Sequence, residues 1–130
     1  MNALGVQNLS KSHGRLTVLP PVSFQLESGS ALGLFGPTGC GKTTLLRIIA
    51  GLDSPTSGTM TIGGSDANGL PLSARRVGMV FQDLALWPHL SAARHLDYVL
   101  RSTVLDRSAR KVRTQEWLER LGLVTLADAR

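Results

Sequence analysis

The stretch GPTGCGKT at residues 36–43 decides the fold, because it matches the pattern G-x-x-x-x-G-K-[ST] in full. Glycines in this pattern let backbone N–H groups wrap a phosphate chain without clashes from Cβ atoms, and the helix that follows directs its positive end at the anion. Lys42 supplies a point charge for the β- and γ-phosphates, the Thr43 hydroxyl is a ligand for Mg²⁺, and Thr44 is placed for the α-phosphate. The predicted phosphate-binding residues are Gly36, Pro37, Thr38, Gly39, Cys40, Gly41, Lys42, Thr43 and Thr44.

The segments on either side of this loop fit the same interpretation. Residues 31–35 (ALGLF) are apolar on both faces, which is typical of a buried parallel strand, and residues 77–81 (VGMVF) predict a second one. Residues 43–50 (TTLLRIIA) carry apolar side chains at helical spacing, and Gly51 is well placed to end that helix. We interpret Cys40 as a small space-filling residue rather than a catalytic thiol, because no base is evident beside it.

The first third of the chain predicts antiparallel strands. Residues 3–9 and 22–27 alternate apolar and polar side chains, with a turn at residues 12–15 between them. The prolines at 20 and 21 place the second strand at an edge or at a break. Residues 59–62 predict a further short strand.

The last third predicts two helices. Ser91 is a suitable N-cap for a helix that runs through Arg101, and Asp106 or Ser108 caps another that ends before Gly122. The order of strands, then strand, loop and helix, then helices predicts an α/β domain with an antiparallel appendage.

Composition narrows the function classes. Hydrophobic residues make up 42% of the 130 residues and charged residues 18%, which describes a globular chain and excludes a disordered tail. A single cysteine excludes an internal disulfide. From the sequence we expect neither a signal peptide nor a membrane anchor, because its apolar stretches are shorter than the ~20 residues needed to cross a membrane. Residues 71–130 hold 10 basic and 6 acidic residues, mixed as on a solvated helix surface rather than on a nucleic-acid face. We expect a soluble, cytoplasmic protein with no nucleic-acid partner.

Several ordered motifs carry a resemblance to the ATP-binding subunits of ABC transporters. The loop with residues 44–52 (TLLRIIAGL) resembles their Walker A region, and residues 57–64 (SGTMTIGG) resemble the strand and turn that follow it. Residues 77–82 (VGMVFQ) resemble the strand leading into their Q-loop, and residues 86–91 (LWPHLS) resemble the stretch after it. The resemblance covers essentially the whole chain and indicates the importer branch, of the sugar, iron and polyamine type.

The resemblance implies a P-loop NTPase core, a parallel sheet with helices, together with an N-terminal antiparallel β subdomain and the start of a helical subdomain. Residues 1–35 would be mainly antiparallel β, residues 36–81 the Walker A core, and residues 82–130 the Q-loop and helical subdomain. The chain holds no LSGGQ signature, Walker B Asp-Glu pair or later switch histidine. We therefore expect the N-terminal part of one ABC ATPase domain, truncated before the signature motif. It is expected to bind ATP but to be deficient in hydrolysis, which needs a metal-anchoring carboxylate and a group that orients water.

The resemblance also implies roles outside the loop. Gln82 would be the Q-loop glutamine, catalytic together with Lys42 and a metal ligand together with Thr43. His13 lies at the A-loop position, where the family usually stacks an aromatic ring on adenine, and an ordinary turn residue is the alternative. Val18 matches an apolar contact to the base or ribose, with core packing as the alternative.

The helices after Ser91 resemble the helical subdomain that binds the permease subunit together with the Q-loop. Trp87 is a candidate apolar anchor there, with buried packing as the alternative. The family commonly has Glu-Asn where this chain has Arg94-His95. The implied partners are ATP with Mg²⁺, an ABC permease subunit and a second ATPase subunit in a head-to-tail dimer. The implied location is the inner face of the plasma membrane, held through the permease.

The leading hypothesis is an ATP-binding subunit that couples ATP binding and hydrolysis to solute import across a bacterial membrane. The alternative is a non-hydrolytic nucleotide-binding regulatory module, or a truncated remnant of such a subunit. A P-loop kinase or nucleic-acid ATPase is a third hypothesis, which the motifs at residues 77–82 and 86–91 disfavour.

Overall fold

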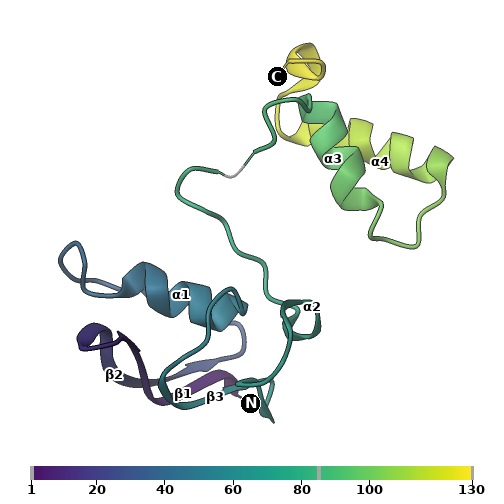
Figure 1. Cartoon of the computed structure of the whole chain (residues 1–130). Coiled ribbons are helices and arrows are strands. Elements are labelled where there is room, and N and C mark those ends of the chain that lie inside the picture. Colours follow the sequence, from purple (N-terminus) through teal and green to yellow (C-terminus); the bar gives the residue numbers. More distant parts are fainter. Residues whose placement is uncertain (1, 85, 130) are drawn as a thin grey trace. The chain divides into compact units, whose positions relative to one another are not determined.

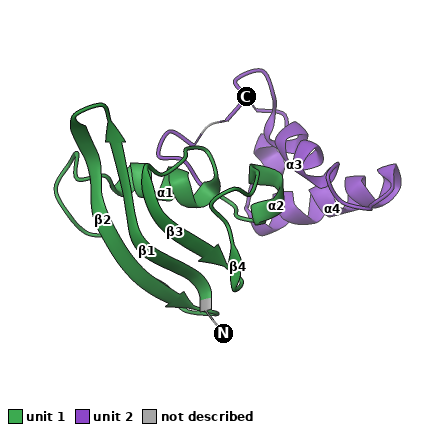
Figure 2. Ribbon diagram, turned by 60° about the horizontal axis from the view of Figure 1, so that its bottom comes forward, with its two compact units in different colours: residues 1–79 green, residues 80–130 purple. Residues whose placement is uncertain are grey.

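The computed structural model describes residues 2–84 and 86–129. These residues belong to two compact units, Met1–Met79 and Val80–Arg130 (Figure 2). The first unit holds the sheet and the predicted phosphate loop, and the second holds Gln82 and the two predicted helices.

The first unit is built on a four-stranded antiparallel sheet in the order β2-β1-β3-β4. Its strands are β1 (Asn2–His13), β2 (Leu16–Glu27), β3 (Ser57–Ile62) and β4 (Ser65–Asp66). The predicted antiparallel strands are confirmed and are longer than expected, because the hairpin turn is confined to Gly14 and Arg15. β2 runs through Pro20 and Pro21 at the edge of the sheet, where residues without an N–H donor are tolerated.

One helix completes the core of this unit. α1 (Lys42–Ala50) lies over the sheet (Figure 1), and its buried Leu45 and Ile48 pack with the sheet residues. The buried cluster consists of Val6, Leu9, Leu19, Leu45, Ile48, Met60 and Ala67. Full burial of a side chain of this size stabilises the fold by about 1.5–3 kcal/mol, so packing on the sheet fixes α1 more firmly than helix propensity does. Gly51, at φ 85°, ends the helix as predicted.

The two segments predicted as buried parallel strands do not form strands. Residues 31–35 and 77–81 have no strand pairing, and the side chains of Phe35 and Val80 are 95% and 87% exposed. A strand that is apolar on both faces is stable between parallel neighbours, and the described residues form only antiparallel pairs. The strand assignment at these two segments is therefore wrong for this structure.

A buried arginine closes the carboxyl end of α1. Arg75 is the last residue of the short helix α2 (Leu72–Arg75) and is 5% exposed. It donates hydrogen bonds to three backbone carbonyls, those of Ile48, Ile49 and Leu70. The guanidinium therefore satisfies carbonyls in the last turn of α1 and offsets the negative end of the helix dipole.

An ion pair fastens the segment after α1 to β1. Lys11 Nζ lies 2.7 Å from Asp53 Oδ1 and donates to the carbonyl oxygen of Ser54, also at 2.7 Å. The hydrogen bond from Lys11 holds the pKa of the Asp53 carboxyl below its ordinary value, against the smaller opposing effect of burial. The pair therefore stabilises the fold in the ionised state of Asp53.

The second unit is a pair of packed helices, α3 (Ala92–Leu100) and α4 (Arg107–Arg120), followed by the short 3₁₀ helix η1 (Val124–Leu126). The Asp106 side chain accepts a hydrogen bond from Ala109 N at 2.8 Å, so Asp106 rather than Ser108 caps α4. No helix among the described residues combines the length and the apolar character needed to cross a membrane.

The amino end of α3 is satisfied in a way that the sequence did not predict. Ser91 takes the N-cap position, but its side chain makes no capping hydrogen bond. Instead, the N–H groups of Ala92 and Ala93 donate to the carbonyl oxygens of Ala129 and Ala127, at 3.1 and 2.9 Å. The segment after η1 is thereby tied to the start of α3.

Candidate functional site

The predicted phosphate loop leads directly into α1. Gly39 and Gly41 adopt left-handed conformations with φ of 84° and 93°, and Gly41 is the N-cap of the helix. A residue with a Cβ atom rarely adopts such a conformation. The backbone therefore requires glycine at these two positions of the motif.

Gly41 also fixes the loop against the sheet. A Cβ atom at this position would approach the carbonyl oxygen of Val18 to 2.5 Å and the Cα atom of Leu19 to 3.1 Å. Only glycine allows β2 to lie this close to the start of α1. The half-buried Val18 consequently lies next to the loop, and its contact with a base or ribose stays a prediction.

The Lys42 side chain folds over the loop. Its Nζ donates to the carbonyl oxygens of Gly36 and Pro37 at 2.7 and 2.8 Å, and lies 3.6 Å from Cys40 Sγ. None of the ion pairs among the described residues includes this lysine. The loop therefore presents a positive charge that carbonyl dipoles hold in place and that no carboxylate of the described residues neutralises.

The amino end of α1 is open, in contrast to its carboxyl end. No side chain caps it, and its first turn contains no acidic residue. The first N–H groups of a helix lack partners within the helix, and they form its positive end. Together with the Lys42 ammonium they are a donor set for phosphate oxygens, and the exposed Thr43 hydroxyl is accessible to a metal ion. The residues present fit the phosphate chain of a nucleotide.

The other predicted site residues lie outside the loop. His13 is exposed at the end of β1, beside the hairpin turn. Gln82 is exposed in a turn of the second unit, so Gln82 and the loop belong to different compact units. Trp87 is 43% exposed and makes an edge contact with Tyr98 and a stacked contact with His95, with ring centroids 4.7 and 5.7 Å apart. It is therefore neither fully buried nor a free anchor.

Sequence reasoning missed two features of the described residues. One is Arg75, whose burial no local pattern indicates, because its carbonyl partners come from another segment of the chain. The other is a cleft between α3 and α4, lined largely by basic side chains that the sequence indicated as solvated helix surface. A single-sequence pattern would find neither, since both depend on contacts between elements.

Left-handed glycines, a lysine over the loop carbonyls and an open helix amino end are the features of a P-loop protein. The ABC transporter family model matches residues 19–130, which is most of the chain. The chain therefore belongs to the ABC transporter family, and the resemblance seen in its motifs is confirmed.

Curated relatives of the chain are named as ATP-binding proteins of import systems. The chain is 44% identical over 117 residues to the Fe(3+) ions import ATP-binding protein FbpC of Rhizobium etli, covering 90% of this chain and 33% of that protein. It is 38% identical over 124 residues to the probable sulfate/thiosulfate import ATP-binding protein CysA of Chlorella vulgaris, covering 95% of this chain and 52% of that protein. The chain thus spans about a third to a half of the length of these relatives.

Solved structures of ATP-binding cassettes have a similar fold. The dimeric cassette MJ0796, in a post-hydrolysis state bound to ADP and Pi, matches with a TM-score of 0.81 at 27% identity. That match covers 96% of this chain and 60% of the cassette chain. A second dimeric structure of the same cassette matches with a TM-score of 0.82 at 27% identity. These likenesses confirm the predicted P-loop NTPase fold class.

Proposed function

We propose that the chain is part of the ATP-binding subunit of an ABC importer and binds Mg-ATP through residues 36–44. The observation that carries this proposal is the Lys42 ammonium, held over the loop carbonyls at the open end of α1 without a carboxylate partner among the described residues. The names of the relatives, which refer to iron and to sulfate or thiosulfate import, support solute import as the process that ATP binding and hydrolysis serve.

In this proposal each part of the loop has one task. Lys42 exchanges its carbonyl partners for oxygens of the β- and γ-phosphates, and the first-turn N–H groups of α1 bind further phosphate oxygens. The Thr43 hydroxyl binds Mg²⁺, which neutralises charge on the phosphates when it is bound. His13 and Val18 contact the adenine and ribose. Gln82 would be a further ligand of Mg²⁺ and would act together with Lys42 in hydrolysis.

We further propose three regions within the chain. Residues 1–35 form the antiparallel β part, residues 36–81 the nucleotide-binding core, and residues 82–130 the Q-loop and helical part that contacts a permease. The dimeric state of the similar cassette supports a second ATPase subunit as partner. Contact with a permease would hold the protein at the cytoplasmic face of the plasma membrane.

Nucleotide titration of the full chain tests the proposal. We expect Lys42→Ala to weaken binding of a fluorescent ATP analogue, in the presence of Mg²⁺, by about tenfold or more, because a charge-assisted contact contributes about 1.5–3 kcal/mol. Arg47→Ala is the matched control, since it removes the same charge from the exposed side of the same helix. It should leave the affinity unchanged.

Inorganic triphosphate, used as a competitor, separates the phosphate contacts from the base contact. His13→Tyr should tighten ATP binding and leave triphosphate binding unchanged, because only stacking on adenine improves. Equal ATP affinity of Lys42→Ala and the unsubstituted chain would contradict the assignment of the loop.

A further inference from the structure

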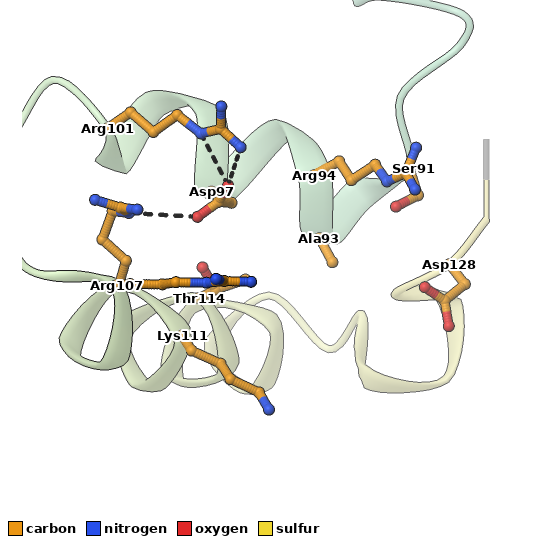
Figure 3. A pocket seen from close by; sticks show the side chains of 10 residues that line it. Ser91, Ala93, Arg94, Asp97, Arg101, Arg107, Lys111, Thr114 and Asp128 are labelled. Atoms are coloured by element: carbon orange, nitrogen blue, oxygen red, sulfur yellow. Dashed lines mark hydrogen bonds and ion pairs between the residues drawn. The ribbon is translucent and has the colours of Figure 1, made fainter.

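The second unit contains a cleft between α3 and α4 that the proposed function does not use (Figure 3). Its volume is about 430 Å³. Half of its ten lining residues are basic: Arg94, Arg101, Arg107, Arg110 and Lys111. Two carboxylates, those of Asp97 and Asp128, also line the cleft, so its formal net charge is +3.

Most of the positive charge in this cleft is not neutralised. Asp97 is shared between two guanidinium groups, with Oδ2 at 2.9 Å from Arg101 Nη2 and Oδ1 at 3.5 Å from Arg110 Nε. Figure 3 shows Asp97 between the arginine side chains of the two helices. The other three basic residues of the cleft have no ion-pair partner among the described residues. An anion bound in the cleft would therefore lie next to cationic side chains that form no ion pair with a carboxylate of the described residues.

Two buried polar atoms of the cleft lack hydrogen-bond partners in the described structure, namely Thr114 Oγ1 and Arg110 Nε. Thr114 is 9% exposed, and Arg110 Nε makes only the 3.5 Å ion-pair approach to Asp97. Buried polar atoms in native proteins nearly always have partners. Arg110 Nε faces the Asp97 carboxylate, so the Thr114 hydroxyl is the buried donor of the cleft that is left without an acceptor among the described residues. A bound oxyanion would supply that acceptor.

The shape of the cleft is fixed by backbone hydrogen bonds. The carbonyl oxygens of Ala127 and Ala129 accept from the first N–H groups of α3, which holds Asp128 at the cleft. The side chain of Asp106 caps the amino end of α4. The two helices that supply the basic residues, α3 and α4, are therefore both held at their amino ends.

We infer that this cleft binds a small, multiply charged oxyanion of the phosphate type. Guanidinium groups donate paired N–H bonds to phosphate oxygens, and a threonine hydroxyl adds a single donor. The volume exceeds that of one phosphate group, so pyrophosphate or a small phosphomonoester also fits. An extended acidic protein segment would meet the exposed Arg94, Arg101 and Arg107, but it would not account for the buried Thr114 hydroxyl, which needs an acceptor inside the cleft.

Residue-resolved NMR titration tests this inference in the full chain. The Lys42→Ala variant serves as background, so that phosphate binding at the loop does not mask the cleft. Inorganic pyrophosphate, inorganic phosphate and glycerol phosphate are added separately at constant ionic strength, with chloride as the non-binding anion. We expect saturable shifts at the amides of Arg94, Arg110, Thr114 and Asp128. The comparison of phosphate with glycerol phosphate distinguishes a free anion from an esterified one.

Matched variants separate a built site from diffuse charge. Arg107→Ala combined with Lys111→Ala should weaken pyrophosphate binding by about tenfold or more. Arg113→Ala combined with Arg120→Ala removes two charges from α4 outside the cleft and should change the affinity by less than about twofold. Thr114→Val keeps the shape of the side chain and should weaken binding by about threefold to tenfold through loss of one hydrogen bond.

Three results would overturn the inference. One is the absence of saturable shifts at the cleft with any of the three anions. Another is equal weakening by the two double variants, which would reduce the effect to net charge. The third is an unchanged pyrophosphate affinity of Thr114→Val, provided that the spectrum of this variant shows an intact fold. The Thr114 hydroxyl would then make no hydrogen bond to the ligand. Because the background lacks Lys42, failure here leaves the nucleotide proposal separately testable.

Discussion

The loop at residues 36–43 and the cleft between α3 and α4 both offer donors to an anion, but they obtain these donors in different ways. The loop uses backbone geometry, with left-handed glycines, the open end of one helix and one lysine. The cleft uses side chains from two helices, and its backbone only holds those helices in place. A site made of backbone is fixed by few positions and tolerates almost no change there, whereas a site made of side chains can be adjusted one charge at a time.

The largest effect is expected at Gly41, where the backbone site can be broken. Gly41→Ala adds a Cβ atom 2.5 Å from the Val18 carbonyl oxygen at a φ of 93°. The clash and the left-handed strain together should lower the free energy of unfolding of the first unit by about 3 kcal/mol. Urea unfolding monitored by circular dichroism measures this loss.

Gly39→Ala is the matched control for that substitution. It has a similar φ of 84°, but nothing lies within 4 Å of the added Cβ atom. It should cost only the backbone strain of about 1 kcal/mol. Equal destabilisation by the two variants would show that the approach of β2 to the loop does not matter.

A somewhat smaller effect is expected at the opposite end of α1. Arg75→Met keeps an apolar stem but leaves the carbonyls of Ile48, Ile49 and Leu70 without their donor. The loss should be about 2–3 kcal/mol, because buried acceptors of a charged donor become unsatisfied. Arg76→Met removes an exposed cation next in sequence and should change the unfolding free energy by less than about 0.5 kcal/mol. Similar values for both variants, from urea unfolding, would contradict the role given to Arg75.

Substitutions in the cleft between α3 and α4 should change its affinity for an anion without unfolding the second unit. Asp97→Asn releases Arg101 and Arg110 from their shared carboxylate and raises the formal charge of the cleft by one. Pyrophosphate binding in the Lys42→Ala background should tighten about threefold, a modest gain because the cleft is open to solvent and salt screens it. The same NMR titration measures the change. Weaker binding would show that Asp97 positions the arginines instead of competing with the ligand.

The smallest effect concerns the ion pair of the first unit and its dependence on pH. The pKa of Asp53 is lowered in the folded state, so its stabilising contribution is complete above the unfolded value of about 3.9 and is lost as the pH falls through the lower folded pKa. Asp53→Asn should therefore cost about 0.5 kcal/mol or less at pH 7, and still less as the pH drops below about 4. Urea unfolding at several pH values checks this. A difference that grows on acidification would have the wrong sign.

Local patterns in the sequence predict the loop, α1, the antiparallel strands and both helices of the second unit. The signals that predict them come from residues close in the chain, such as Gly51 at the end of α1 and Asp106 at the start of α4. The strands expected at residues 31–35 and 77–81 fail, because an apolar run reports that burial is possible but not which neighbour provides it. The cleft is invisible for a related reason, since basic residues in a sequence look the same on a solvated face and on the wall of a site.

The two ends of α1 differ in one more respect that bears on the whole molecule. Gly51 and Arg75 complete the hydrogen bonding of its carboxyl end, whereas its amino end has no capping side chain. The helix therefore has hydrogen-bond partners at its carboxyl end but lacks a side-chain cap at its amino end. A bound phosphate would act as that cap. Ligand binding and the folding of the first unit then share one free-energy term, so saturating nucleotide would raise the melting temperature of the unit as well as occupy it. The binding free energy of the nucleotide would thus add to the folding free energy of the sheet and helix that bind it.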